Sequence, residues 1–403
     1  MTKKEINSHH HNYSNCFGIN SQIDYITIAK AIGIIMVVCG HIGGIYKIIG
    51  IPVFNSKPSE IFPIYSYHMP LFIFISGYFY KQGYIYDIKG LIKKRLKTLV
   101  IPYYKWNLFY GLLVTVLINV GLFNNGNKIN LYNYFLEPIF QGYQYNLNGP
   151  SWFLISLFFI QIGYTLIRKR LNNNILDVKL SLLLFIITII VNIWSNNIVM
   201  ENHPIPLFLS RTLFGVLFFH IGYCFNIYFK SKNNLCVPDL LFIVFLKYFL
   251  TIIIGKNYTL SMRTMLLRGM SIVPILSAIL GIIYILYISK LIEKILLNRD
   301  LKYLKMFFGF ISKNTFAIMM HHMTINMFIQ LILDSMDKNN IVYIIWYYSE
   351  DVVKPVICIL FSVLFNKYVG SFLDEIYLRI VIMFKFLKEN KLKENKNVHL
   401  KDL

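Results

Sequence analysis

Two ionisable residues lie inside an apolar stretch near the start of the chain, IAKAIGIIMVVCGH at 28–41. Lys30 and His41 are eleven positions apart. In a helix this spacing brings both to one face, about 16 Å apart along the axis. Histidine can transfer protons near neutral pH. Each residue also has an ordinary explanation: Lys30 could extend its amine to the inner membrane surface, and His41 could lie at the outer boundary.

Two other apolar segments carry histidines that are expected at a similar depth. His68 lies in YSYHMPLFIFISGYFYK, and with the orientation derived below it falls in the outer third of its helix. Pro70 removes a backbone hydrogen bond and frees the carbonyl of Ser66, which favours a kink or a cavity there. His322 lies about 24 Å along a helix that would begin near residue 306, again in the outer third.

The histidines could share a catalytic site or bind a metal. His321 and His322 are about 100° apart on a helix, so only one of them is expected to face such a site. Three histidines suit proton transfer or zinc. We expect no metal, because no carboxylate or cysteine lies at a matching depth. Cys39 lies on a different face from His41, and His220, near the middle of its segment, is expected to have no such neighbours.

Basic residues inside the apolar stretches form a second group. Four are expected in the inner halves of their helices and one in an outer half: Lys30, Lys105, Lys247 and Lys313, and Arg211. Acids that could pair with them are nearly absent, and Asp24 at the inner edge is the main candidate. Unpaired cations in a membrane are costly, so either they extend to the interface or an anionic ligand neutralises them. Interfacial placement is favoured for each lysine alone, whereas the set as a whole is compatible with a site for phosphate groups.

The composition indicates the elements that must hold these residues. Of the 403 residues, 56% are hydrophobic and only 15% are charged, against about 25% charged in typical soluble domains. Apolar stretches long enough to cross a bilayer recur along the chain. They lie near 24–43, 61–80, 99–121, 152–168, 180–198, 206–229, 240–255, 270–290, 306–333 and 352–370. The sequence therefore predicts an all-α integral membrane protein, a bundle of about ten transmembrane helices.

The distribution of positive charge predicts the orientation. The net charge is +21, and most lysines and arginines fall in alternate connecting segments. This asymmetry favours a multi-pass protein of the cell membrane with both termini cytoplasmic and with basic loops facing anionic lipid. The charge is dispersed rather than gathered on one patch, so no nucleic-acid partner is expected. We expect a polar cytoplasmic tail over 1–22 and a basic disordered tail over 388–403, with interfacial helices near 81–98 and 371–387.

Several motifs make the chain similar to a known family. They are Lys30 and His41 separated by ten residues, HMPLFIFISGYFYK at 68–81, a basic run leading into IPYYKW at 101–106, WFLISLFF at 152–159 and SKNTFAIMMHH at 312–322. In this order they resemble the membrane-bound acyltransferase-3 family, most closely its fucose 4-O-acetylase-like branch. Ser312 and Ser151 depart from the residues often found there. The resemblance assigns residues 23–387 to an acyltransferase-like transmembrane domain.

The resemblance implies an O-acyltransferase that uses cytoplasmic acetyl-CoA and acts on a hydroxyl of a cell-surface or lipid-linked glycan. His41 would be the catalytic histidine, with Lys30 as its basic partner and His322 rather than His321 as the later histidine. Together with the residue analysis, it leads to the following hypothesis. The CoA phosphates bind among Lys30, Lys105, Lys313 and Arg95, and His41 acts as a general base or transient acyl carrier. His68 and His322 orient it, and Tyr143, Tyr145 and Trp152 could stack on sugars.

Two other classes remain open from the sequence. Buried histidines and cations also suit a polysaccharide exporter or flippase subunit without acyl-transfer chemistry, although no inverted repeat is visible. A structural or sensory membrane protein would leave the histidines unexplained. The acceptor sugar, the acyl group and the oligomeric state are undetermined at this stage.

Overall fold

A computed structural model gives the architecture of the chain. It describes residues 23–42, 67–122, 127–142, 145–171, 177–196, 203–229, 237–254, 260–267, 272–299, 301–337, 341 and 352–379. Within these ranges the protein is helical, apart from one hairpin of two-residue strands, β1 (Leu260–Ser261) and β2 (Leu266–Leu267). The predicted tails over 1–22 and 388–403 lie outside the described residues.

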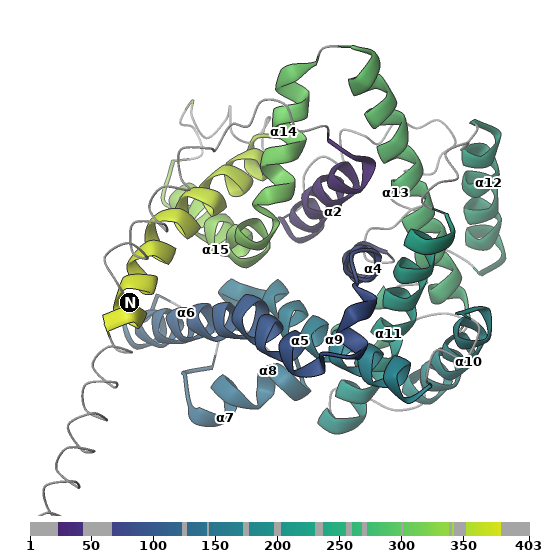
Figure 1. Cartoon of the computed structure of the whole chain (residues 1–403). Coiled ribbons are helices and arrows are strands. Elements are labelled where there is room, and N and C mark those ends of the chain that lie inside the picture. Colours follow the sequence, from purple (N-terminus) through teal and green to yellow (C-terminus); the bar gives the residue numbers. More distant parts are fainter. Residues whose placement is uncertain are drawn as a thin grey trace, which may run out of the picture.

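Each predicted apolar stretch contains a helix in its described part (Figure 1). The long helices are α2 (Tyr25–Ile42), α4 (His68–Tyr78), α6 (Ile101–Asn119), α9 (Trp152–Arg170), α10 (Asp177–Asn196), α11 (Pro204–Tyr228), α12 (Val237–Ile254), α13 (Val273–Asn298), α15 (Thr315–Asp334) and a helix over Val352–Arg379. The short ones are η3 (Gln82–Ile85), α5 (Ile88–Arg95), η4 (Leu96–Val100), α7 (Leu131–Phe135), α8 (Glu137–Phe140), η5 (Asn146–Ser151) and α14 (Lys302–Lys313). Seven helices of the described chain are long and apolar enough to cross a membrane. The fold is that of an all-α integral membrane protein.

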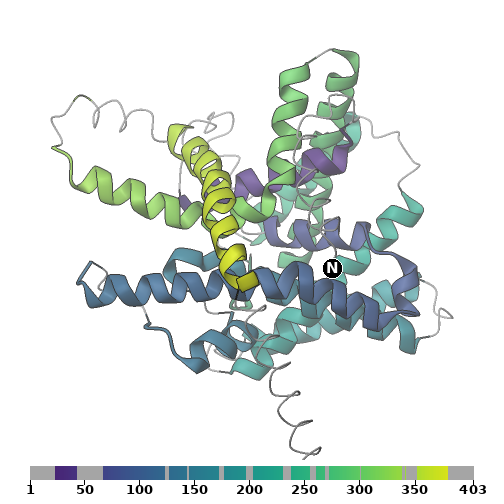
Figure 2. The same cartoon turned by 60° about the vertical axis from the view of Figure 1, so that its left-hand side comes forward.

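The prediction of one helix over 306–333 is wrong. The chain breaks at Asn314, between α14 and α15, where the backbone leaves helical geometry at φ −97° and ψ 15°. The Asn314 side chain donates to the Phe310 carbonyl at 2.8 Å, which is the local bonding by which asparagine competes with a continuous helix. Figure 2 shows α14 and α15 running in different directions. The depth of His322 therefore cannot be measured along one axis from residue 306.

The second predicted interfacial helix, over 371–387, is not a separate element in its described part. One helix runs from Val352 to Arg379 without a break at 371. Apolar residues continue at helical spacing across that position, so hydropathy alone suggested a boundary that the backbone does not have. The basic segment near 81–98 does form short helices beside the bundle, η3, α5 and η4.

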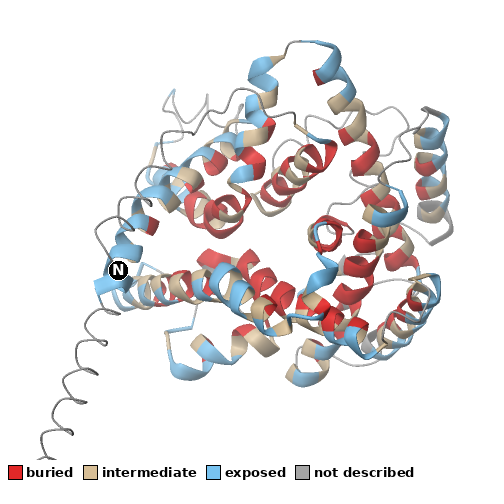
Figure 3. Ribbon diagram, in the orientation of Figure 1, coloured by how far each residue is buried: buried red, intermediate tan, exposed pale blue. Residues whose placement is uncertain are grey.

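The burial pattern fits a protein whose outer faces meet lipid. Buried residues line the inward sides of α2, α4, α9 and α11, whereas α12 is largely exposed (Figure 3). α10 exposes a row of large apolar side chains: Leu182, Leu183, Ile186, Ile190 and Ile193. Apolar surfaces of this kind are rare on soluble monomers and mark contact with a membrane or a partner.

Glycines set the central crossing of α4 and α11. A Cβ atom on Gly77 would lie 1.9 Å from the carbonyl oxygen of Phe219, and one on Gly222 would lie 2.0 Å from that of Phe74. The two backbones are thus in direct contact at reciprocal positions, which small residues allow in membrane bundles. This crossing fixes α4, which carries His68, at the centre of the molecule.

Candidate active site

Two histidines from distant parts of the chain meet where α2 approaches α15. The ring centroids of His41, near the end of α2, and His322, on α15, lie 5.3 Å apart with the planes at 66°. His322 is fully buried, whereas His41 is partly exposed. The pair therefore joins a desolvated ring to one that a substrate can reach.

The hydrogen bonds of the two rings fix which nitrogen is basic. His41 Nδ1 lies 2.8 Å from the Val37 carbonyl oxygen, and His322 Nδ1 lies 2.8 Å from that of Ile318. A carbonyl can only accept, so each Nδ1 carries the proton and each Nε2 carries the lone pair. His322 Nε2 is buried and has no hydrogen-bond partner among the described residues. Both imidazoles are thus held in the tautomer that a general base requires.

His321 is held on another side of α15. Its Nε2 donates to Asn366 Oδ1 at 3.2 Å, and its Nδ1 lies 2.7 Å from the Tyr110 hydroxyl. The Trp106 ring packs edge-on at 4.2 Å between centroids. His321 therefore links α15 to α6 and to the helix over 352–379, and His322 is the one that faces His41.

His68 begins α4 and is buried. The preceding residue, Tyr67, packs its ring against the Cα position of Gly281 on α13 and points its hydroxyl at Met36 Sδ on α2, 3.4 Å away. Tyr67 therefore links the start of α4 to α2 at Met36, five residues before His41 in the sequence. The role of His68 in shaping the site stays a prediction.

Lys30 has no anionic partner in the described part of the chain. Its side chain is partly buried, and no described carboxylate pairs with it. Asp24, the expected partner, instead accepts a hydrogen bond from the Thr27 amide at 2.8 Å and caps the start of α2. The Lys30 ammonium is therefore available for an anionic ligand.

Two of the other cations have partners that the sequence did not suggest. Lys105 pairs with Asp374 at 2.7 Å, so Asp24 is not the main acid for this group. Lys247 is fully buried and donates to the carbonyl and the hydroxyl of Ser277 on α13. Lys247 therefore ties α12 to α13, and Lys105 ties α6 to the last described helix.

A phenol in the basic segment is surrounded by cations. Lys94 donates to the Tyr84 hydroxyl at 2.9 Å. This bond, aided by the charges of Lys94, Arg95 and Lys81, lowers the pKa of Tyr84. Arg95 is partly buried, and its Nε has no partner among the described residues. Lys313, the other predicted phosphate ligand, is exposed at the end of α14.

The predicted sugar-stacking residues are not open platforms. Tyr145 is 1% exposed and donates to Asn133 Oδ1, and Trp152 is 6% exposed beneath the guanidinium of Arg211. Tyr143 lies outside the described residues. The position of these aromatic residues suggested that they are exposed, but these two rings support the loops instead.

The segment η5, which precedes Trp152, is joined to α15. Thr324, two residues after His322, donates to the Leu147 carbonyl at 2.8 Å.

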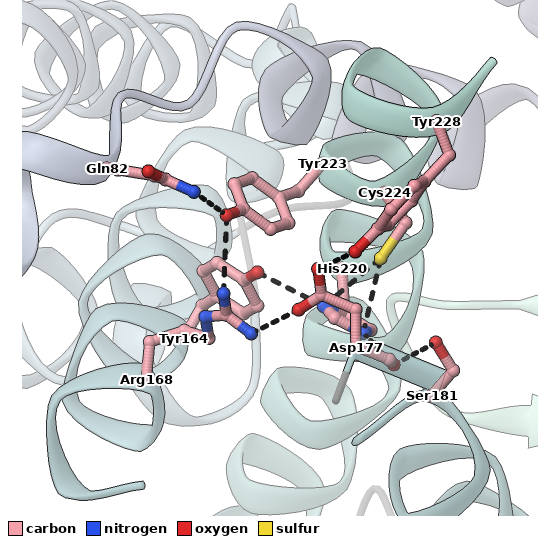
Figure 4. A network of polar contacts seen from close by, with 9 residues as sticks. All are labelled: Gln82, Tyr164, Arg168, Asp177, Ser181, His220, Tyr223, Cys224 and Tyr228. Carbon is pink, nitrogen blue, oxygen red and sulfur yellow. Dashed lines mark hydrogen bonds and ion pairs between the residues drawn. The ribbon is translucent and has the colours of Figure 1, made fainter. Parts of the chain in front are cut away.

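A polar network at the opposite end of the bundle was missed by the sequence analysis, which left His220 without neighbours. Figure 4 shows its side chains: Gln82, Tyr164, Arg168, Asp177, Ser181, His220, Tyr223, Cys224 and Tyr228. Arg168 pairs with Asp177 at 2.5 Å, and the other carboxylate oxygen accepts from Tyr228 at 2.7 Å. His220 Nε2 donates to the Asp177 carbonyl at 3.1 Å. The network joins α9, α10 and α11. The spacing of His220 and Cys224, one helical turn apart, was the available signal.

The same network contains potential metal ligands. One ligand atom each from Asp177, His220 and Cys224 lie within 4.8 Å of one another. Both carboxylate oxygens already bind Arg168 and Tyr228, and His220 Nδ1 lies 3.1 Å from the Tyr164 hydroxyl. A metal would have to displace the guanidinium and bind beside its positive charge. The donor set therefore fits a hydrogen-bonded ion pair better than a metal centre.

Comparison with known proteins adds one finding. The sequence model of a family described as an acyltransferase domain, the acyltransferase-3 family, matches residues 23–367. This range includes both histidines of the pair, Lys30 and the network of Figure 4. Searches of curated proteins and of solved structures found no match.

Proposed function

Because the chain belongs to the membrane-bound acyltransferase-3 family, whose model matches residues 23–367, we propose that it transfers an acetyl group from acetyl-CoA to a hydroxyl of a cell-surface or lipid-linked glycan. The family establishes a membrane-bound acyltransferase. The acetyl donor, the glycan acceptor and the cell membrane as its location are the proposed part. The observation that supports the chemistry is the His41–His322 pair, with the basic nitrogen of each ring set by its hydrogen bond.

In the proposed reaction the donor enters from the cytoplasmic side. Lys30 lies about 16 Å below His41 on the same helix face and can pair with a phosphate of CoA. Arg95 and Lys313 are further candidates, since the described residues offer neither an acid partner. Lys105 would have to exchange Asp374 for the ligand. The thioester arm then extends along α2 toward the histidines.

The transfer step uses His41 as a general base. His41 Nε2 takes the proton of the acceptor hydroxyl while its oxygen attacks the thioester carbonyl carbon. A C–O bond forms, the C–S bond breaks, and the imidazolium returns the proton to the leaving CoA thiolate. The products are an acetyl ester and free CoA, so no oxidant or reductant is needed.

His322 and His68 would act on His41 and its surroundings. The buried His322 ring meets the His41 ring edge to face and so restricts its rotation. His68, buried at the start of α4, would shape the pocket for the thioester. Both roles are those of positioning residues.

The experiment compares wild type with His41→Ala, and uses His203→Ala as a control. His203 is an exposed histidine at the start of α11, and no described contact joins it to the His41–His322 pair. NMR of glycans from host strains that express each form at equal levels measures O-acetyl groups. Binding of CoA to the purified full chain in lipid nanodiscs measures the donor site.

We expect O-acetyl signals to disappear only in His41→Ala, while all three proteins bind CoA. Full acetylation by His41→Ala would overturn the role of this histidine. A wild-type protein that binds no CoA would overturn the proposed donor. Unmodified glycans whose surface amount falls in His41→Ala would favour export of the polysaccharide.

A further inference from the structure

The hairpin β1–β2 carries an exposed arginine, Arg263, beside Arg211 of α11. Met262 and Met265, on either side of the turn, are 3% and 1% exposed and anchor it in the core. Met265 has φ +51°, a left-handed conformation that non-glycine residues seldom adopt. The packing around the turn therefore holds its backbone in this conformation. Arg263 lies between the two methionines and is exposed. The hairpin thus has a fixed base and presents one cation at its tip.

A second arginine fixes the position of this tip. Arg211, 1% exposed on α11, donates through Nη1 to the Arg263 carbonyl at 3.3 Å and through Nη2 to the Ile139 carbonyl at 2.8 Å. Its guanidinium lies over the Trp152 ring, 5.6 Å from the centroid. Arg211 therefore joins the hairpin to α8 and to the start of α9.

Glycine makes room for both side chains. Gly142 has φ +64°, and a Cβ atom there would lie 2.4 Å from Arg211 Nη1 and 3.5 Å from Arg263 Cγ. Any larger residue would collide with the Arg211 guanidinium. The close packing of the two arginines at this point is therefore a built feature of the outer loops.

Arg211 and Trp152 connect the hairpin to η5 at the start of α9. A Cβ atom on Gly149 of η5 would lie 3.0 Å from Sδ of Met323, the residue after His322.

The charge of Arg263 has no acidic counterpart among the described residues. Glu137 is an acid on the neighbouring helix α8. Its buried Oε2 has no hydrogen-bond partner among the described residues. Two neighbouring guanidinium groups without an acid favour an external anion.

We propose that Arg263 binds an anionic group of the acceptor, a carboxylate or a phosphate, and thereby directs the acceptor hydroxyl to His41. Arg211 is the positioning residue that holds the hairpin in place. The proposal rests on the proposed function, because it names the class of acceptor for the same site. It makes acidic or phosphate-bearing glycans the preferred substrates.

Binding of simple glycosides tests this without knowledge of the natural acceptor. The probes are methyl β-D-glucuronide, glucose 6-phosphate and the neutral methyl β-D-glucoside, titrated into the full chain in phosphatidylcholine nanodiscs. A charge-assisted contact predicts that at least one anion binds about 10- to 100-fold more tightly than the neutral sugar. Arg263→Gln should abolish this preference, and Arg263→Lys should retain most of it.

Arg170→Gln is the matched control, since it removes an exposed arginine at the opposite end of α9. It should leave the preference unchanged. Equal or absent binding of all three probes to wild type, or an unchanged preference in Arg263→Gln, would overturn the proposal. Loss of the preference in nanodiscs of phosphatidylglycerol would also overturn it, by assigning Arg263 to a lipid headgroup. CoA binding is measured in the same samples, so failure of the donor site is distinguished from failure at Arg263.

Discussion

Adjacent histidines on α15 have opposite surroundings. His322 meets His41 and keeps a buried nitrogen without a partner among the described residues, whereas both nitrogens of His321 are engaged. A group with unused bonding capacity can take part in chemistry, and one with all its bonds made stabilises the fold. The assignment of roles thus depends on a rotation of about 100° around one helix axis.

This difference predicts separate effects of two substitutions. His322→Ala should lower kcat by about 10- to 100-fold, because His41 loses the ring that restricts it, while the melting temperature changes little. His321→Ala should cost about 1–3 kcal/mol of stability, because it removes the buried bonds to the Tyr110 hydroxyl and to Asn366 Oδ1. Thermal unfolding and acetyl-transfer rates of the same preparations measure both. Equal loss of activity with unchanged stability in the two variants would contradict the assignment.

The lysines allow a similar comparison for the donor site. Lys30→Ala should weaken CoA binding by about 10-fold or more, since it removes an ammonium that no acid of the described residues pairs with. Lys105→Ala should have a smaller effect, because Asp374 already holds this ammonium. CoA titration of the purified variants measures the ratio. A larger loss in Lys105→Ala would show that the ligand displaces Asp374.

At the scale of elements, the crossing of α4 and α11 is the most restrictive contact. Gly77→Ala and Gly222→Ala should each destabilise the protein by several kcal/mol or prevent folding, because the new methyl group would overlap a carbonyl of the facing helix. Gly83→Ala is the control, since nothing lies within 4 Å of its Cβ position. Yield and thermal stability after membrane extraction are the measurements. Tolerance of both alanines would mean that the helices separate at this point.

At the scale of the whole molecule, the charge asymmetry predicts which ends face the cytoplasm. In a form with the native cysteines replaced, Arg263→Cys should react with an impermeant maleimide in intact cells. Lys94→Cys and Arg170→Cys should react only after permeabilisation, because their segments carry the inside charges. All three positions have exposed or accessible side chains. The reverse pattern would place both termini outside.

The network of Figure 4 and the histidine pair lie at opposite ends of the helix bundle. His41 lies at the end of α2, whereas Arg168 and Asp177 lie where α9 ends and α10 begins. The bundle between them is fixed by the glycine crossing. In the proposed reaction, a donor that enters from the cytoplasm would therefore deliver its acyl group along α2 to the His41–His322 pair.

Hydropathy and helical periodicity are local properties, and for this reason the sequence by itself determined much of the architecture. It identified the apolar helices, the common face of Lys30 and His41, and the family that the comparison then confirmed. It also favoured His322 over His321, although only through the family motif. These features depend on neighbours within a few turns of one helix.

The tertiary structure decided which groups meet. Asp374 pairs with Lys105 across 269 positions, and His322 meets His41 across a similar distance in the chain. The break at Asn314, the surroundings of His220 and the placement of Arg263 likewise arise from contacts between separate elements. Such contacts depend on how helices cross, and a single sequence carries no periodic signal for them. They turn a set of buried ionisable residues into a histidine pair, a series of structural ties and an arginine without an acid partner among the described residues.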